Sequence, residues 1–233
     1  MGSFDQKAFN AFILKEGIVG FKQEPITLAS GRTSHFYVNW RTATDHLWGI
    51  ESLSNAILDY AIQNGLRNAD CFYGVPEGAS KVGFLTQYKW AKQFLGRHDT
   101  RYPIPMGRGK PKEHGDPKDR YFVGVPEGKI VIIEDVTTTG SSLLKEVQKV
   151  REAGAQVIAA IGLTNRMERR DDGLSVGQAL VAQGVPYFHM SDAVTLLPLA
   201  YEQQKPNAAT VEAVEREFEQ FGLEKLVLRR IQL

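Results

Sequence analysis

The chain has a single cysteine and no long hydrophobic run. One cysteine cannot form an internal disulfide, and this is typical of a reducing compartment. No apolar stretch approaches the roughly 18 residues that a membrane span requires. Residues 1–6 lack the charged and then apolar pattern of a signal peptide, and position 6 is not the Ser or Thr that myristoylation requires. We therefore expect a cytoplasmic protein with no membrane partner.

Neither sign of charge dominates. The chain has 28 Lys and Arg against 27 Asp and Glu, a net charge of +1, which gives no reason to expect nucleic acid as a partner. Two nucleotide-binding patterns are also missing. Without Gly-x-x-x-x-Gly-Lys-Ser/Thr a P-loop ATPase is excluded, and without Gly-x-Gly-x-x-Gly after a strand a dinucleotide site is not predicted. The remaining composition, 42% apolar and 24% charged, is that of an ordinary globular protein.

Hydrophobic periodicity predicts strands that alternate with helices along the chain. Strands are expected near residues 17–21, 36–40, 71–74, 102–105, 129–134, 157–163 and 187–189. Helices are expected near residues 5–16, 47–61, 78–95, 143–153, 174–183, 192–204 and 211–221. The alternation predicts parallel pairing in an α/β fold with a doubly wound sheet, in a single domain over residues 1–233. The segments 74–81, 134–142 and 165–169 should then meet around one cleft, because each follows a strand.

The most informative of these segments is residues 130–142. Four β-branched residues, 130–133, indicate a strand buried on both faces, and the acids Glu134 and Asp135 follow at its carboxyl end. Three threonines, a glycine and two serines then lead into a helix. A helix N-terminus of this kind receives phosphate, and carboxylates can accept hydrogen bonds from ribose hydroxyls. An exposed strand end with ordinary helix caps is the alternative, but the order of the parts favours a sugar-phosphate site.

This segment resembles the phosphoribosyl-diphosphate (PRPP) motif of the type I phosphoribosyltransferases. The resemblance implies a central, mainly parallel sheet flanked by helices, a small N-terminal hood formed mainly by about residues 1–40, and a flexible cationic loop at about 106–119. It also implies that Mg²⁺ is the cofactor, bridged through PRPP with no direct protein ligand. The implied PRPP-binding residues are Glu134, Asp135, Val136, Thr137, Thr138, Thr139, Gly140 and Ser141, with Lys81 and Lys110 as further cations.

A stretch rich in glycine, proline and charge forms the second informative segment. From residue 101 to residue 120 there are six Lys or Arg and three Asp or Glu, and residues 106–118 show no periodicity. A solvated surface loop is one reading. However, transfer of a ribose from a diphosphate needs cations to neutralise the departing charge, and a mobile cover to exclude water. A cationic loop with glycine hinges meets both needs.

This loop narrows the resemblance to the orotate phosphoribosyltransferases. The residues that carry it are Arg108, Lys112, His114 and Gly115. The family implies catalytic roles near the diphosphate for Arg108, Lys112 and His114, in the active site of the neighbouring subunit of a homodimer. The family commonly has a lysine directly after the arginine, where this chain has Gly109 and then Lys110. The sequence leaves open whether Lys110 takes the place of that lysine.

Residues 27–39 give a further resemblance to the same family. They contain Ser-Gly-Arg at 30–32 and the aromatic pair Phe36 and Tyr37. As structure, this is a turn followed by a strand, and core packing is the default for both rings. The resemblance implies instead that Phe36 and Tyr37 lie beside the pyrimidine ring of orotate. Many bacterial members have a ligand-contacting lysine where this chain has Ala29.

Two more segments match at strand ends. Residues 74–81 resemble the Gly-Val-Pro form of the family's diphosphate-binding turn, with Glu77 where tyrosine is usual. Lys81 is either a cation of that turn or a helix-surface lysine. Residues 164–169 resemble the family's Asp-Arg-x-Glu-Arg, and Arg166 could form a bidentate pair with the orotate carboxylate, with a structural salt bridge as the alternative. The orotate-binding set is thus Phe36, Tyr37, Thr138 and Arg166.

These resemblances imply transfer of the 5-phosphoribosyl group from PRPP to orotate, giving orotidine 5′-phosphate and diphosphate in pyrimidine biosynthesis. Two alternatives remain open. One is a phosphoribosyltransferase for another nucleobase, for which Ala29 and Glu77 are the reasons. The other is a PRPP-sensing regulator of the same fold, although the sequence shows neither the basic face nor the winged-helix segment expected of one that binds nucleic acid.

Overall fold

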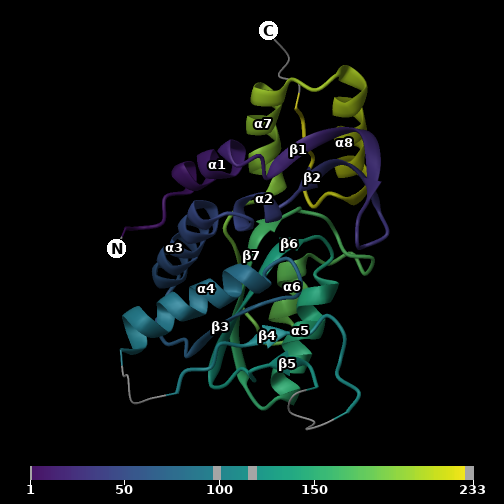
Figure 1. The fold of residues 1–233 in the computed structure, drawn as a ribbon. Coiled ribbons are helices and arrows are strands. Elements are labelled where there is room, and N and C mark those ends of the chain that lie inside the picture. Colours follow the sequence, from purple (N-terminus) through teal and green to yellow (C-terminus); the bar gives the residue numbers. More distant parts are fainter. Residues whose placement is uncertain (1, 97–100, 115–119, 229–233) are drawn as a thin grey trace.

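The computed structural model describes residues 2–96, 101–114 and 120–228 of the chain. At its centre is a sheet of four parallel strands, confirming the predicted mainly parallel sheet (Figure 1). In order across the sheet, these strands are β3 (Cys71–Gly74), β6 (Lys129–Thr137), β7 (Gln156–Asn165) and β8 (Tyr187–His189). No helix in the described ranges has both the length and the apolar character that crossing a membrane demands.

Strand β6 explains why the sheet is buried on both faces. Successive side chains of a strand point to opposite sides. Ile130 and Ile132 accordingly pack into one hydrophobic cluster, whereas Val131 and Ile133 pack into another. All four side chains are fully buried. The β-branched run predicted as a core strand therefore joins two separate halves of the core.

Helices cover both faces of the sheet, as the alternating pattern predicted. One face packs against α3 (Leu47–Gln63) and α4 (Ser80–Trp90), and the other against α5 (Ser141–Glu152) and α6 (Val176–Val181). A π-helical turn, Ala91–Leu95, extends α4 and completes the helix expected near 78–95. In Figure 1 the first pair lies to the left of the sheet and the second pair to its right.

The predicted hood lies beyond the carboxyl ends of the sheet strands (Figure 1). It is an antiparallel pair of strands whose inner side chains join the core. Its elements and the helices packed around it are α1 (Gln6–Lys15), β1 (Val19–Thr27), β2 (Thr33–Val38), the short α2 (Arg41–Thr44), α7 (Ala193–Gln204) and α8 (Ala208–Phe221). Helix α8 contacts both hood strands, so the C-terminal helix is part of the hood's support.

The prediction of a strand at 102–105 was wrong. These residues have no regular structure, and the strand β4 (Met106–Gly107) begins directly after them. Pro103 and Pro105 explain the difference, because proline has no N–H to donate to a neighbouring strand. β4 pairs antiparallel with β5 (Phe122–Val123), so the base of the cationic loop is a short hairpin rather than unstructured chain. Residues 115–119 of the loop lie outside the described part.

Candidate active site

The turn between β6 and α5 forms one wall of a pocket of about 250 Å³. The hood and the segment after β7 contribute the remaining wall. The lining residues are Ala29, Ser30, Glu134, Val136, Thr138, Thr139, Gly140, Ser141, Ser142 and Asp171. Of the acid pair and turn predicted to hold PRPP, all but Asp135 and Thr137 therefore line this one pocket.

Gly140 sets the geometry of the turn. Its φ of +69° is in the left-handed region that favours glycine, and a Cβ atom there would lie 2.8 Å from Val176 Cγ1. As the N-cap of α5, Gly140 brings no side-chain acceptor to the first turn of the helix, and that turn has no acidic residue. The positive end of the α5 dipole is thus left for an anion in the pocket.

Glu134 is a buried acid with an unused acceptor. It is 7% exposed, and burial, reinforced by the neighbouring Asp135 carboxylate, raises the pKa of Glu134 well above its ordinary value. Its Oε2 atom is buried without a hydrogen-bond partner in the described part of the chain. Because buried polar atoms are normally paired, this oxygen is suited to receive a donor from a ligand, such as a hydroxyl.

The Asp135 carboxylate is bound by the backbone of the next residue in β6. Its Oδ1 atom accepts a hydrogen bond of 2.9 Å from the backbone N–H of Val136. Burial raises the pKa of Asp135, while this hydrogen bond and the charge of Arg41 on α2 act in the opposite direction. A Cβ atom at Gly78 would overlap the Asp135 carboxylate, so the segment after β3 reaches the acid pair only because position 78 is glycine.

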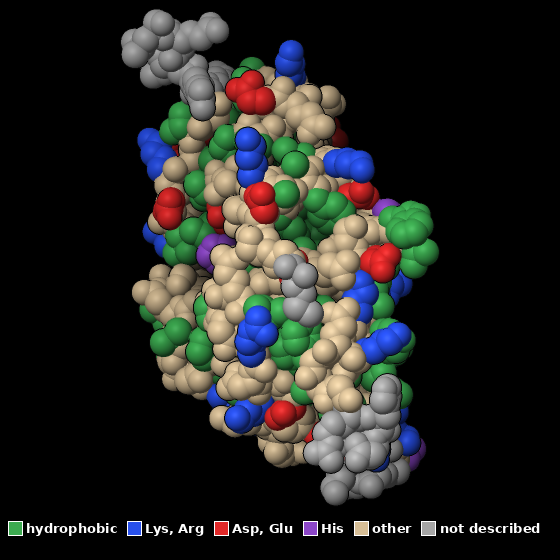
Figure 2. All heavy atoms as spheres, turned by 90° about the vertical axis from the view of Figure 1, so that its left-hand side faces the viewer, with side chains coloured by type: hydrophobic (Ala, Val, Ile, Leu, Met, Phe, Trp, Pro, Cys, Tyr) green, Lys and Arg blue, Asp and Glu red, His purple; other side chains and the backbone are tan. Residues whose placement is uncertain are grey.

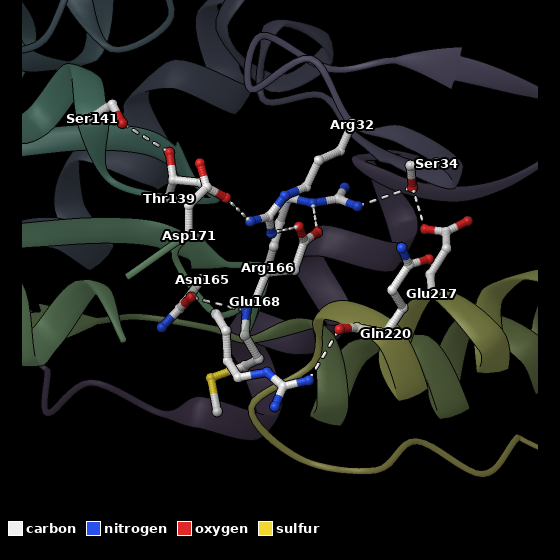
Figure 3. A network of polar contacts seen from close by, with 12 residues as sticks. Arg32, Ser34, Thr139, Ser141, Asn165, Arg166, Glu168, Asp171, Glu217 and Gln220 are labelled. Atoms are coloured by element: carbon white, nitrogen blue, oxygen red, sulfur yellow. Dashed lines mark hydrogen bonds and ion pairs between the residues drawn. The ribbon is translucent and has the colours of Figure 1, made fainter. Parts of the chain in front are cut away.

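The three threonines of the turn have different surroundings. Thr137 is buried, and its Oγ1 atom lies 2.6 Å from the hydroxyl of Tyr187 on β8, which directs this side chain into the sheet. Thr138 lines the pocket. Thr139 Oγ1 lies 3.0 Å from Ser141 Oγ at the start of α5 (Figure 3). Thr138, Thr139 and Ser141 thus supply hydroxyls to the pocket, whereas Thr137 anchors the strand end.

The described cations of the predicted loop are not among the residues that line this pocket. Arg108 is half-buried at the loop's base, where its Nε donates to Phe122 O at 3.2 Å. Lys110, Lys112 and His114 are exposed. The backbone N–H of Lys112 donates to Arg120 O at 2.8 Å, which continues the hairpin beyond β4 and β5. Gly115, the last residue of the loop pattern, lies outside the described residues.

The predicted diphosphate turn follows β3 as expected. Its glycine, Gly74, approaches Ala79 and Gly83 so closely that a Cβ atom would overlap the backbone of residue 79. Lys81 is exposed in the first turn of α4, and its Nζ atom donates to Thr44 O at 3.2 Å. In this conformation the Lys81 ammonium therefore faces α2.

Arg166 is the centre of a buried network (Figure 3). It is 1% exposed; its Nε donates to Glu168 Oε1 at 2.6 Å and its Nη2 to Ser34 Oγ at 2.9 Å. The guanidinium also stacks on Phe36, 3.7 Å from the ring centre. Burial lowers the pKa of Arg166, and Glu168 partly offsets this. The structural salt bridge named as the alternative is thus present, and binding of a substrate carboxylate by Arg166 stays a prediction.

The predicted aromatic pair divides between core and surface. Phe36 is 1% exposed and stacks on Phe218 of α8, with ring centres 5.9 Å apart. Tyr37, on the opposite side of β2, is half-buried. Phe36 therefore belongs to the core beneath Arg166 in this conformation, as the packing interpretation of this segment anticipated.

Sequence reasoning missed some residues that line or shape the pocket. Asp171 lines it from the segment after β7, and Ala29 and Ser30 line it from the hood turn. Arg41 and Gly78 act on Asp135 from α2 and from the segment after β3. Ala29, Ser30 and Gly78 lie within recognised motifs, whereas Arg41 and Asp171 had no sequence signal, because only the fold brings them to the acid pair and the turn.

A parallel α/β sheet whose central strand ends in two acids, a hydroxylated turn and an uncapped helix N-terminus defines a site for a phosphorylated sugar. Together with the hood and the cationic hairpin, these features define the class: a phosphoribosyltransferase of type I.

Comparison with known proteins narrows this class. No family model matches the chain. Orotate phosphoribosyltransferase of Bradyrhizobium diazoefficiens is 34% identical over 176 residues, covering 72% of this chain and 84% of the relative. The enzyme of that name from Methanocaldococcus jannaschii is 30% identical over 172 residues, covering 73% of this chain and 88% of the relative. The structure of orotate phosphoribosyltransferase from Francisella tularensis aligns with a TM-score of 0.65 at 17% identity, covering 92% of this chain and 99% of that one, which supports the fold.

The chain belongs to the orotate phosphoribosyltransferase family. The family predicted from five short motifs is thereby confirmed.

Proposed function

We propose that the chain transfers the 5-phosphoribosyl group of PRPP to orotate, which gives orotidine 5′-phosphate and diphosphate in pyrimidine biosynthesis. The observation that carries this proposal is the pocket at the end of β6. Glu134, which has an unpartnered buried oxygen, lines this pocket together with the uncapped N-terminus of α5, and Thr138 and Thr139 line it between them. Membership of the family supplies the identity of the second substrate.

The PRPP end of the pocket follows from these groups. The 5′-phosphate would sit on the turn 138–141, where backbone N–H groups, hydroxyls and the helix dipole all favour an anion. The ribose hydroxyls would donate to Glu134 and Asp135. Since burial disfavours the charged form of both acids in the free protein, two donors from the sugar would replace water that the acids have lost.

The transfer itself needs little from acid–base groups. The bond between ribose C1′ and the diphosphate oxygen breaks, and a bond from C1′ to a ring nitrogen of orotate forms. Orotate is already an anion, so no strong general base is required. The protein's task is to hold both substrates in line, exclude water and neutralise the departing diphosphate. Lys112, His114 and Arg108 are the cations proposed for the last task, with Lys81 and Lys110 as additional charges.

The proposed assembly is a homodimer in which the loop of one copy serves the other. Among the described residues, the loop cations do not line their own pocket. Large hydrophobic side chains are exposed on two neighbouring helices, Leu47 and Trp48 on α3 and Phe84 and Tyr88 on α4. Figure 2 shows the face on that side, with hydrophobic side chains reaching the surface among lysines and arginines. Such a surface suits a subunit interface.

Mg²⁺ is the proposed cofactor. No group of three His, Cys, Asp or Glu side chains in the described ranges is arranged to hold a metal ion. The chemistry of the donors fits Mg²⁺ nonetheless, because this ion keeps several waters and is bound through substrate phosphates and at most one or two carboxylates. Glu134 and Asp135 are the carboxylates that would face a Mg²⁺–PRPP complex. When bound, the ion would neutralise diphosphate charge.

For orotate, we propose that the ring lies against the hood turn at Ala29 and Ser30, with Thr138 beside it and Tyr37 and the Arg166 network as its support. The alternative is that the chain transfers the phosphoribosyl group to a different nucleobase. Ala29 lines the pocket and Arg166 is engaged by Glu168, so Arg166 would have to share or release Glu168 to receive the carboxylate of orotate. We further propose that residues 1–233 act as one catalytic domain in the cytoplasm.

The experiment is a turnover assay with the purified protein, PRPP, Mg²⁺ and a panel of nucleobases, followed by ultraviolet absorbance. Orotate should be consumed, and adenine, hypoxanthine and uracil should not. Lys112→Ala should lower kcat by about 10²-fold and leave the melting temperature unchanged, since Lys112 is exposed. Turnover of another base in place of orotate would favour the alternative, and no turnover with PRPP and any base would overturn the enzymatic assignment.

A further inference from the structure

Two neighbouring residues of opposite charge, Arg170 and Asp171, reach two different parts of the site. They lie in the segment between β7 and α6. Arg170 Nη1 donates to the backbone carbonyl of Thr139, in the turn proposed for the 5′-phosphate. Asp171 Oδ1 accepts from Arg32 Nη2 at 2.8 Å, in the hood (Figure 3). One short segment thus makes polar contacts with both walls of the pocket.

The Arg170 contact is well supported on its own segment. Arg170 Nε lies 3.2 Å from Asp172 Oδ2, and the backbone N–H of Leu174 donates to Asp172 Oδ1 at 3.1 Å. The Arg170 side chain is 19% exposed, so it is mostly shielded from water. By binding the Thr139 carbonyl, Arg170 helps to fix the peptide orientation in the turn, where N–H groups must face the phosphate.

The ion pair of Asp171 joins an exposed carboxylate to Arg32, whose side chain is mostly buried. Arg32 is 11% exposed; its Nη1 lies 3.0 Å from Glu168 Oε2, and its guanidinium stacks on Phe221 of α8 at 4.5 Å. Glu168 in turn holds Arg166. Asp171 is 93% exposed and lines the pocket. Arg32 is therefore held by Glu168 and Phe221 as well as by Asp171, and Asp171 is the exposed end of the pair.

We propose that Arg170 and Asp171 form a strap that couples occupancy of the phosphate turn to the position of the hood. This inference rests on the proposed function, because it concerns how the two substrates of that reaction share one pocket. A phosphate that orders residues 138–141 would fix the Thr139 carbonyl, then Arg170, and through Asp171 the hood turn that borders the nucleobase. Both are positioning residues, and the strap makes binding of the first substrate favour binding of the second.

The strap can be tested without unfolding the protein. Ion pairs between exposed side chains contribute little to stability, and the Asp171 carboxylate is almost fully exposed. Asp171→Asn should therefore fold as the wild type does, and urea unfolding checks the stability of Arg170→Gln, whose side chain is mostly shielded from water. Matched controls are Glu219→Gln and Arg216→Gln, which make the same charge changes on exposed positions of α8.

The measurement is a matrix of initial rates with PRPP and orotate varied together in the presence of Mg²⁺. Calorimetric titration of each substrate alone accompanies it. For the wild type and both controls, saturating PRPP should lower the KM for orotate by about fivefold or more relative to low PRPP. In Asp171→Asn this factor should fall close to one, with kcat and the affinity for either substrate alone nearly unchanged. In Arg170→Gln the factor should also fall close to one, and binding of PRPP alone should weaken as well, because Arg170 supports the turn at Thr139.

Three results would overturn the strap. The first is turnover in which the wild type shows no coupling between the substrates. The second is coupling that persists in both variants. The third is a loss of orotate affinity in the absence of PRPP that equals the whole change in the KM for orotate. That result would make Asp171 or Arg170 a direct contact of orotate. A wild type that does not turn over orotate at all would instead overturn the proposed function, and the inference that rests on it would fall for that separate reason.

Discussion

The carboxylate of Glu77 lies directly against Gly109. A Cβ atom at position 109 would overlap Glu77 Oε1, while the next atom of the same side chain would be 3.6 Å away. These are two of the positions at which the sequence departs from the orotate phosphoribosyltransferase pattern, which usually has tyrosine at the first and lysine after the loop arginine. The departures are neighbours in space, on the diphosphate turn and on the base of the cationic loop.

The position of Glu77 leads to a prediction about the KM for PRPP. The Glu77 carboxylate is exposed. On the predicted diphosphate turn it would repel the negative charge of PRPP. Glu77→Gln should lower the KM for PRPP by about two- to fivefold, equivalent to roughly 0.5–1 kcal/mol at a solvated site. Initial rates at low salt would measure the change, with Glu219→Gln as the control. A rise in the KM would mean instead that Glu77 holds the loop in its productive position.

Gly78 should be indispensable for the acid pair. A side chain there would overlap the Asp135 carboxylate, so Gly78→Ala should displace that acid and raise the KM for PRPP tenfold or more, about 1.4 kcal/mol. The control is Gly177→Ala in α6, where a Cβ atom would make an ordinary contact at 3.5 Å with Tyr187. Wild-type kinetics in Gly78→Ala would show that Asp135 can move without loss and is not a ribose ligand.

Arg166 should matter more for stability than an exposed arginine does. Removing it takes a buried donor from Glu168 Oε1 and from Ser34 Oγ, which keep Arg32 and the Phe36 N–H as donors. Breaking a buried ion pair from one side costs about 3–5 kcal/mol. Arg166→Leu should therefore lower the free energy of unfolding in urea by that amount, whereas Arg216→Leu on α8 should change it by less than about 0.5 kcal/mol.

Orotate binding by Arg166→Leu then separates the two interpretations of this residue. If the protein stays folded and loses only orotate affinity, Arg166 is chiefly a substrate ligand. If it loses stability as expected, the salt bridge with Glu168 is its main role, and any loss of affinity is a consequence of the altered hood.

The surroundings of Glu217 lead to a prediction of how the free energy of unfolding depends on pH. From α8 it accepts hydrogen bonds from the Ser34 hydroxyl and the His35 backbone, and burial raises its pKa above the ordinary value of 4.5. The folded state therefore binds this proton more tightly than the unfolded chain, and the stability that results is complete below about pH 4.5 and is lost as the pH rises through the raised pKa.

Glu217→Gln, which cannot ionise, should match the wild type in stability near pH 4 and exceed it at pH 7 to 8. Urea unfolding across this range measures the difference, with Glu219→Gln as the control. A difference of the opposite sign at high pH would show that the two hydrogen bonds to the ionised carboxylate outweigh its burial.

The sequence was enough to predict most of the fold because its signals are local. Four β-branched residues at 130–133 predict a doubly buried strand from their own chemistry, and Gly17, Gly65 and Gly154 end helices where they were expected to. The prediction of a strand at 102–105 was wrong because an apolar pattern alone does not make a strand. Pairing also requires backbone N–H groups, which Pro103 and Pro105 lack.

In the candidate site, too, the part that is contiguous in sequence could be predicted and the part assembled by the fold could not. The acid pair and turn of 134–142 are contiguous, so one stretch of sequence contains both the backbone proposed to bind phosphate and the carboxylates proposed to bind ribose. The contacts of Arg166 are not contiguous: Ser34, Phe36 and Glu168 reach it from the hood and from its own segment. No local pattern distinguishes an arginine left for substrate from one already paired, because the difference depends on which carboxylate the fold places beside it.

The sequence by itself determined the class of protein, because a strand, two acids, a hydroxylated turn and a helix start in that order resemble the PRPP motif of the type I phosphoribosyltransferases. Only the tertiary structure decided which of these groups face the pocket. Thr137 turns to Tyr187 and Thr138 to the cavity, Gly78 makes room for Asp135, and Asp171 meets Arg32 across the site. The reason is physical: backbone N–H groups and helix dipoles follow from local conformation, whereas burial, charge pairing and steric fit depend on residues far apart in the chain.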